Sequence, residues 1–183
     1  MHGIGKTSVL EKLREKGYET IEEGFLEMVK YSVEDNTVID GVLYMTKWLK
    51  NVLQKSYEGH ALVFSDRSMW STMVYRNWIK EEFRDEFSKL LSKIHEELYF
   101  HGIIIKTIYI YDDKETVMNR IISRKCVETD RKCIELDIKH YESIDGEYKN
   151  PYYKWDIMIC RAGMDIDFLA EEVVKVSKFE IYD

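Results

Sequence analysis

Residues 3–8 read GIGKTS and stand at the start of an amphipathic segment that we expect to form a helix from Lys6 to Glu15. The string matches the second half of the pattern G-x-x-x-x-G-K-[S/T], whose backbone N–H groups and helix N-terminus wrap a nucleotide phosphate. In that pattern Lys6 reaches the phosphate oxygens and the Thr7 hydroxyl ligates Mg²⁺. The alternative is a chance match at a disordered terminus. We therefore expect a phosphate loop made of Gly3, Ile4, Gly5, Lys6, Thr7 and Ser8.

Short apolar segments alternate with helical patterns after this loop. Strands are expected in residues 18–24, 61–67, 102–111 and 155–162, and helices in 41–57, 70–99, 114–125, 136–144 and 165–179. The helix 70–99 is expected to break near Arg84, and the charged segment 125–135 to be a mobile loop. Alternating strands and helices predict right-handed crossovers and a mainly parallel sheet. The expected fold is thus three-layered α/β, with helices on both faces of the sheet, in a single domain over 1–183.

Composition argues against several other classes of protein. The net charge of −7 disfavours a surface that binds a nucleic acid polymer. No apolar run approaches the about 18 residues that span a membrane. The three cysteines lack CxxC spacing and the five histidines are scattered, so neither a disulfide framework nor a zinc site is expected. A cytoplasmic protein that acts on a small molecule fits this composition.

Charged side chains follow two of the predicted strands. Asp66 and Arg67 end the strand 61–67, and Glu22 and Glu23 lie near the end of 18–24. Ligands of open α/β sheets bind at the carboxyl ends of strands. Arg67 offers a fork for phosphate oxygens, and Asp66 can hold a magnesium-bound water. Because neighbouring strand residues point to opposite faces, at most one of the two glutamates can accept a proton from an attacking hydroxyl. Surface ion pairs and solvated charges are the alternatives.

A basic cluster lies on the predicted helix 114–125 and just after it. Arg120 and Arg124 are four residues apart and share a helix face, and Lys125 and Arg131 follow. Such a cluster can close over a transferring phosphoryl group and neutralise its charge. We expect a lid at about 120–135, with a solvated helix face as the alternative.

Taken in order, these pieces resemble the deoxynucleoside kinase and thymidylate kinase superfamily of P-loop kinases. The resemblance covers nearly the whole chain: GIGKTS for the phosphate loop, DRSMWSTMVY for the (D/E)R[S/Y/H] motif, ETVMNRIISRK for the helix before the lid, and WDIMICRAGMDIDFLAEEV for the last strand and helix. It implies a P-loop NTPase fold with a parallel sheet of order 2-3-1-4-5, in which the first, central strand is missing here. We accordingly expect the natural protein to begin about ten residues earlier, and 1–183 alone to be weak or inactive.

The resemblance also implies cofactors, partners and residue roles. It implies ATP and Mg²⁺, a nucleoside or nucleotide substrate, and a homodimer. Cys126 stands where a third lid arginine is expected, and Lys125 or Arg131 could substitute. The implied assignments are catalysis by Glu23, Arg67 and Lys6; donor binding by residues 3–8, Arg120 and Arg124; acceptor binding by Glu23, Tyr44, Asp66, Arg67, Trp70 and Tyr75; and metal binding by Thr7 and Asp66.

The acceptor is the open question at this stage. Two adjacent carboxylates, Glu22 and Glu23, repel a dianionic acceptor and favour a nucleoside. The spacing of Ser71 and Tyr75 after Asp66 resembles thymidylate kinases instead, and residues 41–55 lack an evident base-reading glutamine. We expect a deoxynucleoside kinase, with a thymidylate kinase as the alternative and an inactive homologue as a further one. A regulatory or motor ATPase is disfavoured because no apolar strand ends in Asp-Glu.

Overall fold

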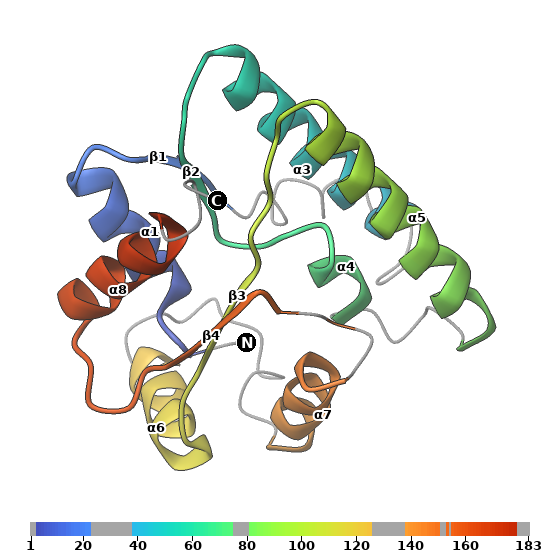
Figure 1. The fold of residues 1–183 in the computed structure, drawn as a ribbon. Helices are drawn as coiled ribbons and strands as arrows, with labels where there is room; N and C mark the ends of the chain where they lie inside the picture. Colours follow the sequence, from blue (N-terminus) through green and yellow to red (C-terminus); the bar gives the residue numbers. More distant parts are fainter. Residues whose placement is uncertain are drawn as a thin grey trace. The chain divides into compact units, whose positions relative to one another are not determined.

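The computed structural model describes residues 3–22, 38–74, 81–125, 138–150, 153 and 155–178. Its contacts divide the chain into two compact units, which are Met1–Lys12 with Lys106–Asp183 (the first unit) and Leu13–Ile105 (the second unit). The elements, labelled in Figure 1, are α1 (Lys6–Glu15), β1 (Glu19–Ile21), α3 (Val38–Tyr57), β2 (Val63–Ser65), α4 (Ser71–Val74), α5 (Glu81–Phe100), β3 (Ile108–Tyr111), α6 (Lys114–Lys125), α7 (Ile138–Tyr148), β4 (Ile157–Cys160) and α8 (Ile166–Lys178).

The first unit is built on the parallel pair of β3 and β4 (Figure 1). Ile108 lies opposite Ile157, and Tyr111 lies opposite Cys160. Val117 of α6 and Leu169 of α8 are fully buried. Ile121 on α6 and Val173 on α8, each four residues further along its helix, are also buried. The burial of this apolar face on each helix supplies the hydrophobic stabilisation of this unit.

The second unit is built on the parallel pair of β1 and β2. Glu19 lies opposite Val63 and Ile21 opposite Ser65. The pairing continues one step past the strands, because the N–H of Asp66 donates to the carbonyl of Ile21 at 3.2 Å. The short helix α4 packs against α3, and all four of its residues are buried.

The predicted bounds of two helices are confirmed, whereas other predicted bounds differ from the structure. Helices α1 and α6 begin and end where the sequence predicts. The break expected near Arg84 is wrong, because α5 runs without interruption from Glu81 to Phe100. No glycine or proline lies within it to stop the helix. The helix ends at Phe100, two residues before Gly102, which has a positive φ of 77° and donates its N–H to the carbonyl of Tyr99 at 2.9 Å. The mobile loop expected at 125–135 lies, apart from the backbone of Lys125, outside the described residues.

The two strand pairs agree with the expected sheet order. In the order 2-3-1-4-5, strand 2 pairs with strand 3 and strand 4 pairs with strand 5. Neither of these two pairs includes strand 1. These are the pairs β1–β2 and β3–β4, and both are parallel. Within the described part of the chain, no helix has the length and apolar character needed to cross a membrane.

Candidate functional site

The GIGKTS segment forms a tight loop that leads directly into α1. Gly3 and Gly5 have φ values of 68° and 90°, a region that favours glycine. A Cβ at Gly3 would lie 2.7 Å from Cγ1 of Ile121, and one at Gly5 would lie 2.6 Å from Nη1 of Arg161. Both glycines are therefore required by backbone conformation and by close packing.

This loop has the shape and chemistry to hold nucleotide phosphates and Mg²⁺. The N-terminus of the ten-residue helix α1 carries a partial positive charge beside the glycine turn. Thr7 is exposed in the first turn of α1 and Lys6 is half-buried beside it. Among the residues that the structure describes, no three His, Cys, Asp or Glu side chains form a metal cluster. The roles of Thr7 and Asp66 in binding Mg²⁺ stay predictions.

Three charged residues lie around the loop in the first unit. Asp112 directly follows β3 and Arg161 directly follows β4, at the carboxyl ends of the paired strands. Nη1 of Arg120 lies 2.8 Å from Oδ2 of Asp112, whose side chain is 1% exposed. Nη1 of Arg161 donates to the carbonyl of Ile4 in the loop at 2.6 Å. Burial lowers the pKa of Arg161 and the nearby Arg120 lowers it further, whereas Asp112 raises it.

The expected lid arginines are described only in part. Arg120 lies on α6 and is held by Asp112. Arg124 lies in the last turn of the same helix, and its side chain is outside the described part of the chain. The closing role expected for both residues stays a prediction.

The second unit holds the Asp66–Arg67 pair in a defined backbone position. Nε1 of Trp48 donates to the carbonyl of Arg67 at 2.8 Å and to Oγ of Ser65 at 3.1 Å. The Ser65 hydroxyl donates to the same Arg67 carbonyl at 2.6 Å. Because these bonds converge on one carbonyl, α3 and the end of β2 fix the backbone at Arg67. Trp70 follows in the turn before α4.

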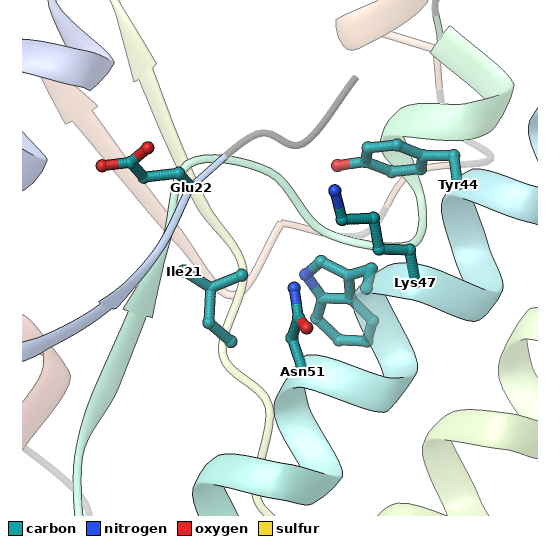
Figure 2. A pocket seen from close by; sticks show the side chains of 6 residues that line it. Ile21, Glu22, Tyr44, Lys47 and Asn51 are labelled. Carbon is teal, nitrogen blue, oxygen red and sulfur yellow. The ribbon is translucent and has the colours of Figure 1, made fainter. Parts of the chain in front are cut away.

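A pocket opens between α3 and the end of β1 (Figure 2). The empty space beside its lining residues amounts to about 210 Å³, part of which is open solvent. Four lining residues lie on one face of α3, at the spacing i, i+3, i+4 and i+7. The lining consists of Ile21, Glu22, Tyr44, Lys47, Trp48 and Asn51. Tyr44, which we predict at the acceptor site, lines this pocket, and its role in acceptor binding stays a prediction.

Glu22 lines this pocket, but its carboxylate forms an ion pair with Arg14. Nη2 of Arg14 lies 2.6 Å from Oε1 of Glu22 and also donates to Oγ1 of Thr20 at 3.0 Å. Figure 2 shows the carboxylate turned away from the side chains of α3. The Arg14 charge offsets much of the repulsion that Glu22 would exert on an anionic acceptor. Glu23 and Tyr75, both predicted at the acceptor site, lie outside the described residues.

Sequence reasoning missed four residues that the structure places at these sites: Asp112, Arg161, Lys47 and Asn51. Asp112 could have been found, because it directly follows the predicted strand 102–111. Arg161 lies within the predicted strand 155–162, and the sequence does not indicate its contact with Ile4. Lys47 and Asn51 share the helix face of Tyr44 and Trp48, but the sequence does not indicate which face meets β1.

A glycine loop before a helix, together with parallel strand pairs and interleaved helices, defines a nucleotide-binding P-loop fold. The family model of the AAA domain matches residues 2–142, and the chain belongs to that family. Among solved structures, it is similar to a deoxyadenosine kinase from M. mycoides with the products dCMP and a flexible dCDP bound. That match has a TM-score of 0.57 and 16% identity, and it covers 97% of this chain and 95% of the kinase. No curated protein matches the chain. The predicted fold class is therefore confirmed as that of deoxynucleoside kinase-like P-loop proteins.

Proposed function

We propose that this protein is a kinase that transfers the γ-phosphate of ATP to the 5′-hydroxyl of a deoxynucleoside. The single observation that carries the proposal is the pocket at the end of β1, which lies in the same unit as the Asp66–Arg67 pair. Its wall combines the aromatic rings of Tyr44 and Trp48 with the amide of Asn51. Aromatic rings suit a flat nucleobase, and an amide can donate to and accept from a base edge.

The donor half of the reaction is assigned to the phosphate loop. Backbone N–H groups of residues 3–8 would hold the phosphates, with Lys6 on the β and γ oxygens. Mg²⁺, when bound at Thr7, would screen the charge of the phosphates. Arg67 would steady the transferring group, since its planar fork matches phosphate oxygens.

The acceptor half is assigned to Glu23 and the pocket. The 5′-oxygen bonds to the γ-phosphorus, the bond from that phosphorus to the β,γ-bridging oxygen breaks, and ADP leaves. The proton of the hydroxyl passes to the carboxylate of Glu23, which acts as the general base. Trp48 and Tyr44 would hold the base and thereby limit the positions that the hydroxyl can take.

A thymidylate kinase of the same fold is the second candidate, and two observations favour it. Lys47 brings a positive charge into the pocket wall. Glu22, whose charge argued against a phosphorylated acceptor, is paired with Arg14. Both features make the pocket more tolerant of an anion than the sequence alone indicates.

A coupled ADP-release assay with the four deoxynucleosides and with dTMP tests the proposal. We expect turnover of at least one deoxynucleoside. Glu23→Gln should lower kcat by about a hundredfold or more, because a general base contributes that much. The matched control is Glu19→Gln, which removes a β1 carboxylate that pairs with Lys55 at 3.0 Å outside the pocket. This control should keep the original kcat. Turnover of dTMP alone, with Glu23→Gln harmless, would favour the thymidylate kinase instead.

A further inference from the structure

Arg161 is a buried arginine whose backbone is held on both sides. Its N–H donates to the carbonyl of Tyr111 at 2.8 Å, and its own carbonyl accepts from the N–H of Met164 at 2.8 Å. The residue is only 8% exposed. Arginine is rarely buried to this extent without a partner for its charge. The contacts of its guanidinium therefore indicate its role.

The guanidinium anchors a carbonyl in the middle of the phosphate loop. Nη1 donates to the carbonyl of Ile4 at 2.6 Å. No cis peptide bond occurs among the described residues, and in a planar trans peptide the carbonyl and the following N–H point in opposite directions. With the Ile4 carbonyl held by Arg161, the N–H of Gly5 is directed away from Arg161. Phosphate loops bind anions through N–H groups of this kind.

Packing couples the loop to the same guanidinium. A Cβ at Gly5 would lie 2.6 Å from Nη1 and 3.3 Å from Cζ of Arg161. The backbone at Gly5 therefore rests directly on the charged group, with no room for a side chain between them. Any shift of the guanidinium would change the position of the loop backbone.

The charge of Arg161 is balanced only in part by Asp112, which raises the pKa of Arg161 but forms its ion pair with another arginine. Asp112 forms its ion pair with Arg120 at 2.8 Å. Nε of Arg161 is buried and has no hydrogen-bond partner among the described residues. Burial and Arg120 both lower its pKa, although an arginine stays protonated at neutral pH. A bound anion at the loop would offset this desolvation and repulsion.

We propose that Arg161 is a positioning residue of the donor site, which orients the N–H of Gly5 through the Ile4 carbonyl and supplies buried positive charge for a polyphosphate. This inference rests on the proposed function for its ligand, the triphosphate of the nucleotide donor. It adds to the phosphate loop a residue that lies more than 150 positions away along the chain.

Binding of ATP and of inorganic tripolyphosphate to the full chain tests this role by calorimetry. Arg161→Met removes both the hydrogen bond and the charge, and should weaken both ligands by about ten- to hundredfold. Arg161→Gln keeps a donor for the Ile4 carbonyl, and Arg161→Lys keeps the charge, so both should bind more tightly than Arg161→Met. The matched control is Lys175→Met, which removes a cation that pairs with Glu172 on α8. This control should bind as the unmodified chain does.

Two readouts separate positioning from structural damage. The affinity for the acceptor nucleoside should stay unchanged in every Arg161 variant, whereas a misfolded chain would lose it. If Arg161→Met fails to fold, the comparison of Arg161→Gln with Arg161→Lys replaces it. Weaker tripolyphosphate binding by Arg161→Gln would then support the role of Arg161 in the donor site. If Arg161→Met or Arg161→Gln binds tripolyphosphate as tightly as the unmodified chain does, the inference about Arg161 is wrong. The proposed function is not affected by that result. If the unmodified chain binds tripolyphosphate in an Arg161-dependent way but phosphorylates no nucleoside, the inference stands and the proposed function fails.

Discussion

At the scale of single residues, Trp48 joins the pocket to the Asp66–Arg67 pair. Its ring lines the pocket, and its N–H donates to the Arg67 carbonyl at 2.8 Å. Trp48→Phe keeps an aromatic wall and removes this donor. We expect a loss of about 1 kcal/mol in unfolding free energy, and a several-fold rise in KM for the acceptor because Arg67 is less well placed. Denaturant unfolding and steady-state kinetics measure the two effects.

Trp155→Phe provides the matched comparison for this prediction. Nε1 of Trp155 also donates to a backbone carbonyl, that of Tyr148, at 2.8 Å. Trp155 belongs to the first unit, whereas the pocket belongs to the second. The stability cost should be similar and the acceptor KM unchanged. Equal effects of both substitutions on KM would show that Trp48 has no special link to the acceptor site.

Individual site residues could be predicted where their chemistry coincides with a motif. Gly3, Gly5 and Lys6 belong to a loop whose glycines the structure shows to be sterically required. Arg161 escaped notice because its role depends on a hydrogen bond to Ile4, which is 157 positions away. Contacts between such distant positions arise from the fold, and a single sequence carries no local pattern that reports them.

At the scale of elements, the start of the β3–β4 pair depends on Asp156. Its Oδ2 accepts from the N–H of Thr107 at 2.6 Å and from the Thr107 hydroxyl at 2.7 Å. Asp156→Ala should lower the unfolding free energy by about 1–2 kcal/mol, because Thr107 is buried and loses both of these hydrogen bonds. Chemical denaturation, with the midpoint and the slope of the transition recorded separately, measures the change in unfolding free energy.

Asp156→Asn is the control for that change, since its amide oxygen can still accept at the same place. We expect it to lose less than half as much stability as Asp156→Ala. A loss of the same size in both variants would mean that the charge of Asp156, and not its hydrogen bonds to Thr107, supports the strand pair.

The boundaries of elements were predictable where local signals set them. Helix α6 starts after Asp113, whose Oδ1 accepts from the N–H of Thr116 at 2.8 Å, an N-cap arrangement readable from sequence. Strand β3 is shorter than the apolar run 102–111 because a strand extends only as far as its partner does. The ladder begins at Ile108 opposite Ile157, and the sequence of one strand does not reveal where the other begins.

At the scale of the whole molecule, two features bear on the choice between a small-molecule kinase and a motor ATPase. The first is the net charge of −7, which repels a nucleic acid backbone. The second is the acidic pair after β3, which resembles the metal-binding carboxylate of P-loop ATPases. Asp112 is instead buried against Arg120, and Asp113 caps α6. Both carboxylates therefore already have partners within the first unit.

We accordingly expect ATP turnover that depends on a nucleoside and is indifferent to nucleic acid. Single-stranded and duplex DNA should leave the ATPase rate unchanged within about twofold at physiological salt, because a net charge of −7 disfavours the phosphate contacts that release counterions. Fluorescence anisotropy with labelled DNA, recorded beside the ADP-release assay, measures binding and turnover in the same buffer. DNA that binds tightly and accelerates ATP hydrolysis, with no response to deoxynucleosides or dTMP, would reassign the chain to the motor class. A small-molecule kinase and a motor ATPase can share this P-loop domain, so the comparison tests the proposed acceptor at the point where the two classes differ.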